Sequence, residues 1–244
     1  MTSEQTAEAQ RLAALWVRQH REESTAGARL TLVEEKRAKL RNETSLGYAF
    51  SASGFPRGKS YDLWLWRVLS KASVVWAGFY VDDSGKMACL TAQAKIERRA
   101  GVACTAELEK LRTLVASSVR GERLRFALVS TDHTVRGFLD TIPFPVEQRD
   151  GRCHLSVELL SQRGDLFAIW GEGFEPGEEV ALESSFAGKM EKSKQKASTL
   201  GEIGSAVFPA ASGRESGLAN YSAVGKSCKV AVRYEWGLSS LRKE

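Results

Sequence analysis

Apolar and polar residues alternate along much of this chain with a period of two. One such run places Tyr48, Phe50 and Ala52 at every second position. Such alternation is typical of strands that bury one face, because successive side chains of a strand point to opposite sides. Residues that favour turns end these runs about every ten positions, as at 54–58 and 82–85. The pattern predicts a mainly β protein built from antiparallel β-sandwiches.

Three segments depart from this period. Leu12, Leu15 and Trp16 follow helical spacing within residues 6–23, which contain no glycine or proline, so we expect an N-terminal helix there. Residues 106–115 also show helical periodicity and are interpreted as part of an insert. The lysine-rich stretch 189–196 is expected to form a solvated loop.

One turn motif occurs twice. Gly-Phe-Pro-Arg-Gly at 54–58 recurs at 173–177 as Gly-Phe-Glu-Pro-Gly, and the apolar strand residues before it recur as well. Between the copies, two prolines in the stretch 141–146 predict a stiff, extended connector. We therefore expect a helix over 1–24 and tandem immunoglobulin-like sandwiches over 25–142 and 146–238, each close to the length of about 100 residues that such a domain needs.

Composition and charge exclude several classes of protein. Of the 244 residues, 43% are hydrophobic and 27% are charged, which excludes collagen-like and intrinsically disordered chains. No apolar run approaches the roughly 18 residues of a membrane span. The net charge of +5 is spread out, and acidic residues interrupt the basic clusters, so no nucleic-acid partner is expected. The sequence contains no P-loop, dinucleotide-binding, zinc-protease or nucleophile-elbow motif, so we expect no cofactor and favour a non-enzymatic protein.

The four cysteines bear on the cellular compartment. Cys89 and Cys104 fall in one half of the chain, Cys153 and Cys228 in the other, and no Cys-x-x-Cys motif occurs. One disulfide in each half is therefore favoured over four buried thiols. The first residues lack the basic and apolar regions of a secretory leader. We expect a periplasmic or secreted protein whose leader is absent from this chain, or a cytoplasmic one if the cysteines are free.

Aromatic residues provide the main indication of a binding site. Trp64 and Trp66 share one face of a predicted strand whose other face is also apolar. They are interpreted as a ligand-binding platform for sugar rings or a partner protein. The alternative places them beneath the N-terminal helix or against the second domain. The three tryptophans on other predicted strands are expected in the core: Trp76, Trp170 and Trp236.

Catalytic and metal-binding interpretations compete with simple turns. Ser130, Asp132 and His133 contain the residue types of a hydrolase triad or a metal-dependent enzyme, but they stand where a hairpin turn is expected, so no catalytic residue is assigned. The acidic turn at 82–83 could bind calcium, and Cys153 with His154 could bind a soft metal. The acidic residues at 82–83 are of the types that commonly form tight turns. Cys153 and His154 are adjacent in a predicted strand, so their side chains point to opposite sides. No metal site is therefore predicted.

The second copy of the motif also carries a family resemblance. Gly-Phe-Glu-Pro-Gly-Glu-Glu-Val at 173–180 resembles the strand-turn-strand motif of bacterial immunoglobulin-like domains on exported proteins. The ending at 225–237 is similar to uncharacterised bacterial envelope proteins with two such domains. The resemblance covers about residues 25–238. It implies an exported binding or structural module with an unknown protein or glycan partner, and it provides no functional residues.

Overall fold

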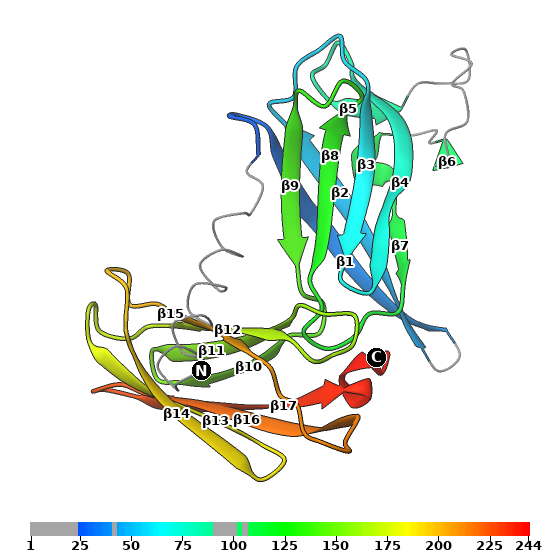
Figure 1. Ribbon diagram of the computed structural model, residues 1–244. Coiled ribbons are helices and arrows are strands. Elements are labelled where there is room, and N and C mark those ends of the chain that lie inside the picture. The colour runs from blue at the N-terminus through cyan, green and yellow to red at the C-terminus, as the bar shows by residue number, and fades with distance from the viewer. Residues whose placement is uncertain (1–23, 41–42, 90–101, 104–106) are drawn as a thin grey trace. The chain divides into compact units, whose positions relative to one another are not determined.

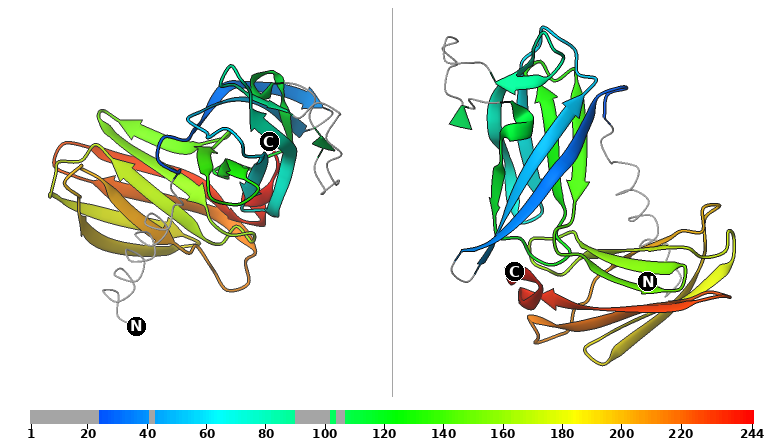
Figure 2. Two further views of the ribbon diagram at one scale, coloured as in Figure 1. Left: turned by 90° about the horizontal axis from the view of Figure 1, so that it is seen from above. Right: turned by 180° about the vertical axis from the view of Figure 1, so that it is seen from behind.

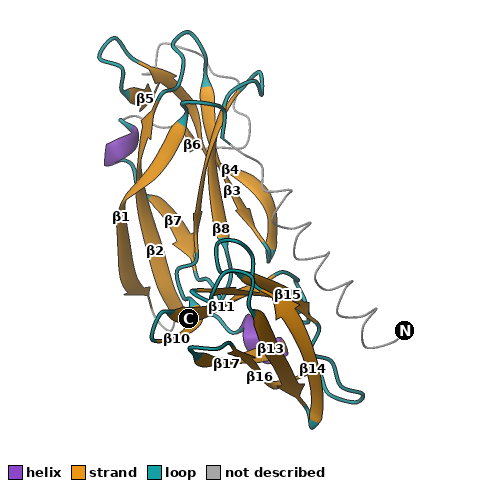
Figure 3. Cartoon of the chain, turned by 90° about the vertical axis from the view of Figure 1, so that its left-hand side faces the viewer, coloured by secondary structure: helices purple, strands orange, loops and turns teal. Residues whose placement is uncertain are grey.

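The fold consists almost entirely of β-strands. The computed structural model describes residues 24–40, 43–89, 102–103 and 107–244. These residues form sheets that are antiparallel except for one short parallel strand pair, with two 3-10 helices, η1 (Leu108–Lys110) and η2 (Leu238–Leu241) (Figure 3). The mainly β prediction is therefore confirmed, whereas the predicted N-terminal helix lies outside the described residues. No helix in the described part of the chain is long and apolar enough to cross a membrane.

The described chain divides into two compact units. The N-terminal unit contains residues 24–118, 123–141 and 243–244, and the C-terminal unit contains residues 119–122 and 142–242. The predicted domain ranges, 25–142 and 146–238, lack this exchange of short segments. Residues 119–122 thus belong to the C-terminal unit, although the residues on both sides of them belong to the N-terminal unit. The last two residues, 243–244, belong to the N-terminal unit.

The N-terminal unit has two sheets, one behind the other in Figure 1 and Figure 2. The first has the order β1 (Arg29–Leu40), β2 (Glu43–Ser53), β7 (Thr113–Ala116). The second has the order β5 (Met87–Cys89), β4 (Ser70–Val81), β3 (Tyr61–Arg67), β8 (Leu124–Ser130), β9 (Arg136–Thr141), and β6 (Val102–Ala103) pairs with β4.

Aromatic rings from both sheets form the core of this unit. Tyr61 and Leu63, on the face of β3 opposite the two tryptophans, are fully buried. The ring of Phe126 on β8 lies 5.1 Å from that of Tyr48 and 4.7 Å from that of Phe50, both on β2. The inner faces of the two sheets therefore share one core.

The C-terminal unit also has two sheets. Their orders are β10 (Val146–Asp150), β11 (Cys153–Leu159), β12 (Phe167–Glu172), β15 (Ile203–Val207), and β14 (Lys189–Lys196), β13 (Glu179–Phe186), β16 (Ser216–Val224), β17 (Lys229–Gly237) (Figure 1). Phe167 on β12 contacts Tyr234 on β17 at 4.9 Å between ring centroids, which joins the inner faces.

The strands of both units follow the same path. The order β1-β2-β7 recurs as β11-β12-β15, and β4-β3-β8-β9 recurs as β14-β13-β16-β17. The first glycine of the repeated turn explains part of this likeness. Gly54 and Gly173 have φ angles of +72° and +87°, and a Cβ atom would come within 1.9 Å and 2.0 Å of the carbonyl oxygens of Gly27 and Arg152. Only glycine allows the turn to approach the start of β1 or β11 so closely.

A charged residue after each turn ties the turn to another loop. Lys59 pairs with Asp132 in the β8–β9 turn and holds the pKa of that carboxyl well below its usual value. Glu178 takes the corresponding place in the C-terminal unit. Its carboxylate accepts hydrogen bonds at 2.7 Å from the backbone N–H groups of Lys226 and Glu175, and these lower its pKa.

Two local predictions are wrong. Residues 189–196 form strand β14, paired along its length with β13, although nearly all of its residues are exposed. The described part of 106–115 holds the single turn η1 followed by strand β7, where a helix was expected. In both cases the pairing with a neighbouring strand outweighs the local sequence preference.

The disulfide predicted for the second half of the chain is confirmed. Cys153, at the start of β11, is bonded to Cys228, which immediately precedes β17. Cys89 is buried at the end of β5, and Cys104, its predicted partner, lies outside the described residues. No cysteine in the described ranges is free. A disulfide is consistent with an oxidising compartment outside the cytoplasm.

Candidate functional site

The outward side of strands β3, β8 and β9 carries a set of side chains that we call the aromatic face. The two tryptophans alternate with buried residues of β3 and so point away from the core. Trp66 stands opposite Arg125, which stands opposite Asp140. Trp64 and Phe138 lie in the next row, on either side of a buried alanine of β8. The strand registers therefore bring together residues from three strands.

The aromatic rings of this face contact one another. The ring centroids of Trp64 and Trp66 are 5.9 Å apart, with an angle of 21° between the ring planes. The ring of Phe138 lies 6.3 Å from that of Trp66 and is tilted by 53°. Side chains two residues apart on a strand can stack only if their rings stand up from the sheet. The two rings are therefore close to parallel, and both side chains are half-buried.

Arg125 holds a fixed position beside these rings. Its Nε donates a hydrogen bond to Oδ1 of Asp140 at 2.7 Å, and its Nη2 donates to Oδ2 at 2.9 Å. The guanidinium carbon lies 5.5 Å from the centroid of the Phe138 ring. A two-pronged contact of this kind fixes the plane of the guanidinium group. The face thus combines rigid aromatic surface with an oriented charged pair, a composition typical of protein-binding hot spots.

The residues of the alternative hydrolase site form a turn. The Ser130 hydroxyl donates to Asp132 at 2.6 Å and accepts a hydrogen bond from the backbone N–H of Val135 at 3.0 Å. In a catalytic triad this hydroxyl would donate to the imidazole. His133 is exposed and has a φ angle of 59°, which places it at the tip of the turn. The arrangement closes the β8–β9 hairpin and does not activate a nucleophile.

The acidic turn considered for calcium is also closed by its own hydrogen bonds. The Asp82 carboxylate accepts from the Ser84 hydroxyl at 2.7 Å and from the backbone N–H of Lys86 at 2.9 Å. These bonds, that of Ser84 first, lower the pKa of Asp82. Within the ranges that the structure describes, no three histidine, cysteine, aspartate or glutamate side chains are grouped so as to hold a metal ion.

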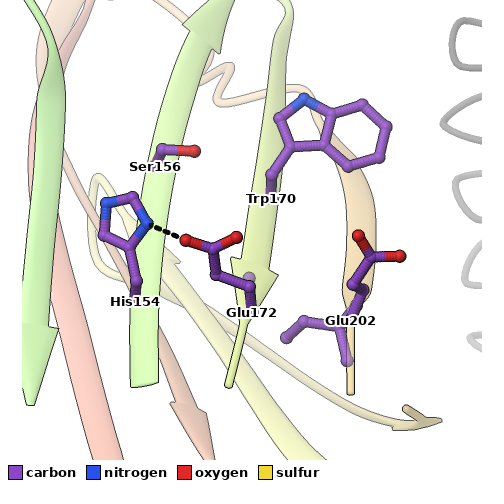
Figure 4. Close-up of a pocket in the computed structure, with 7 residues that line it drawn as sticks. His154, Ser156, Trp170, Glu172 and Glu202 are labelled. Carbon is purple, nitrogen blue, oxygen red and sulfur yellow. Dashed lines mark hydrogen bonds and ion pairs between the residues drawn. The ribbon is translucent and has the colours of Figure 1, made fainter. Parts of the chain in front are cut away.

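A second candidate surface lies on the C-terminal unit, where a hollow of about 200 Å³ opens on the sheet containing β11 and β12. Figure 4 shows its main lining side chains, which come from β11, from β12 and from the residue just before β15: His154, Ser156, Trp170, Glu172 and Glu202. The expectation that Trp170 lies in the core is therefore wrong. Its neighbours Phe167 and Ile169 are buried, whereas Trp170 is half-buried on the outward face. The same alternation could have revealed this, because Trp170 shares its side of the strand with the exposed Glu172.

His154 organises one side of this hollow. Its Nδ1 lies 3.0 Å from Oε1 of Glu172 on β12, and its Nε2 lies 3.0 Å from Oε2 of Glu147 on β10. Each ring nitrogen thus faces a carboxylate from a different strand, which fixes the orientation of the imidazole. Cys153 faces the opposite way, into the core, so the adjacent cysteine and histidine do not share a site.

No family model and no curated protein matches the sequence. The function is therefore inferred from the two surfaces themselves.

Proposed function

We propose that the protein is a non-enzymatic binding module of the bacterial periplasm or cell exterior, built from two tandem immunoglobulin-like sandwiches. The strand order common to both units supports the immunoglobulin-like assignment, since that fold packs two antiparallel sheets over a shared core. The Cys153–Cys228 disulfide supports a location where thiols are oxidised. The proposal includes no cofactor and no nucleic-acid partner.

The aromatic face carries the binding role. A β-sheet that only supports a fold places polar residues on its outward side, whereas this sheet places two tryptophans and a phenylalanine there. Large, already ordered side chains lose little conformational freedom on binding. The near-parallel rings of Trp64 and Trp66, with the Phe138 ring tilted beside them, form an uneven aromatic surface, which suits an irregular protein surface better than the flat face of a sugar ring. The partner of this face is accordingly a protein.

The test is a comparison of partner binding by matched variants. The full chain would be immobilised and used to capture proteins from bacterial envelope extract. Each captured protein would then be purified and its dissociation constant measured by calorimetry. The test variant replaces both tryptophans, Trp64→Ser with Trp66→Ser. The control is Leu114→Ser, which changes an equally apolar residue, 73% exposed, on the other sheet of the same unit.

We expect the double variant to bind a specific partner at least about 30-fold more weakly, as loss of a hot spot does. The control should bind normally. Circular dichroism and the melting temperature establish that both variants remain folded. Unchanged affinity in a folded double variant would contradict the proposal. If the double variant does not fold, Arg125→Gln tests the same face, since removal of its charge leaves the aromatic rings in place.

A further inference from the structure

The hollow beside Trp170 has no part in the function proposed above, which depends on the N-terminal unit. Four kinds of polar or aromatic group line it: the indole of Trp170, the imidazole of His154, the hydroxyl of Ser156, and the carboxylates of Glu172 and Glu202 (Figure 4). Small-ligand sites combine an aromatic wall with a few convergent polar groups in this way. The identity of those groups indicates the chemistry of the ligand.

Trp170 lies against the sheet with one face of its ring. Its neighbour on β15 is Gly204, where a Cβ atom would come within 2.7 Å of ring atom Cζ3 and 3.0 Å of Cε3. Only a glycine therefore leaves room for the ring to lie over this strand. The opposite face of the indole turns away from the sheet, and the side chain is half-buried. This differs from the stacked pair of Trp64 and Trp66.

Glu172 places an oriented carboxylate beside the indole. Contact with His154 at 3.0 Å fixes the carboxylate, yet the side chain remains 59% exposed. Ser156 stands directly opposite Trp170 on β11 and adds a hydroxyl that can both donate and accept. A bound molecule would thus meet a flat apolar surface and, at its border, groups that accept hydrogen bonds.

These features match a sugar ring. The C–H face of a pyranose packs on an indole, and its hydroxyl groups donate to carboxylates in strong, charge-assisted hydrogen bonds. Glu172 and Glu202 line the hollow, and Glu147 contacts His154 from the neighbouring strand β10, so anionic sugars meet charge of the same sign. We propose that the hollow is a subsite for one neutral pyranose unit of a glycan.

The test is titration of the full chain with defined oligosaccharides by calorimetry. The neutral probes are maltotetraose, cellotetraose and chitotetraose, and tetragalacturonate is the anionic probe. We expect at least one neutral probe to bind and the anionic probe not to bind. Absence of measurable binding of every neutral probe would overturn the subsite. It would leave the protein-binding role of the aromatic face unaffected, because that role is measured with another ligand and other variants.

Variants then locate the bound sugar. Trp170→Ala should reduce the association constant at least about tenfold, and Glu172→Gln should reduce it about threefold or more. Leu218→Ala is the matched control, because this exposed leucine lies on β16 in the other sheet of the same unit, and the variant should bind the sugar normally. Equal affinity of the Trp170→Ala variant and the unaltered chain would place the sugar elsewhere and overturn the inference. If that variant does not fold, Glu172→Gln decides, because this exposed side chain is not needed for the core.

Discussion

Removal of the Cys153–Cys228 disulfide should destabilise the C-terminal unit selectively. The bond joins residues separated by 75 positions. Loop-closure entropy predicts that losing such a bond lowers the free energy of unfolding by about 4.5 kcal/mol, because the unfolded chain regains the freedom that the bond had removed. With a urea slope of about 1.5 kcal/mol per molar, the midpoint of unfolding should fall by about 3 M.

The perturbation is Cys153→Ala with Cys228→Ala, and Ser227→Ala is the control. The control changes the same turn and removes one exposed hydrogen bond from Arg152, of 2.8 Å, but keeps the disulfide. Hydrogen exchange followed by mass spectrometry in increasing urea reports each unit separately. Amides of β16 and β17 should lose protection at lower urea in the cysteine variant, whereas those of β2 and β8 should not. A shift of the unfolding midpoint below about 1 M would refute the loop-closure argument. Equal loss of protection in both units would refute the expectation that only the C-terminal unit is destabilised.

Three further predictions concern residues that shape the two units. The pKa of Glu178 is lowered in the folded protein, so its ionised form stabilises the C-terminal unit at pH values above the unfolded pKa of 4.5. This stabilisation disappears as the pH falls through the lowered pKa of the folded state. The melting temperatures of the Glu178→Gln variant and of the unaltered chain should therefore differ at neutral pH and converge in acid. Gly173→Ala should lower the free energy of unfolding, measured in urea, by more than about 2 kcal/mol. Gly177 also has a positive φ angle, +74°, but no atom lies within 4 Å of its Cβ position, so Gly177→Ala should lower the same free energy by only about 1 kcal/mol. Trp76→Phe removes the hydrogen bond of 3.0 Å to Thr113 and should cost about 1 kcal/mol by the same measurement.

The sequence predicts those parts of the fold in which local pattern and burial agree. The period of two along β3 assigns Tyr61 and Leu63 to one face and the two tryptophans to the other, and the structure buries the first of these faces. The turn at 173–177 is predictable because a left-handed glycine and a proline restrict the backbone before any tertiary contact forms. Cys153 and Cys228 pair as expected from their isolation in one half of the chain.

Other features depend on contacts that a single sequence does not display. Strand β14 has no buried face and few residues of high β-propensity, and its hydrogen bonds to β13 explain why it is extended. The hollow on the C-terminal unit depends on which residues of neighbouring strands are paired. The pairing of β12 with β15 places Trp170 over Gly204, and the pairing of β11 with β12 places His154 beside Glu172. The period of two assigns each of these residues to a face, but it does not say which residues of neighbouring strands meet.

The two units share their architecture and differ in what they carry on their outward faces. In both units the repeated turn contains a left-handed glycine that is followed by a charged residue. In the N-terminal unit this residue is Lys59, which pairs with Asp132, and in the C-terminal unit it is Glu178, which accepts hydrogen bonds from backbone N–H groups. The opposite charges at the same place indicate that this position holds loops together and is not a binding site, because either sign of charge serves that purpose. The outward faces are built differently: two tryptophans stacked on each other in the N-terminal unit, and one tryptophan laid over a glycine in the C-terminal unit. The two proposed binding surfaces therefore differ in the arrangement of their aromatic rings, although the strand order beneath them is the same.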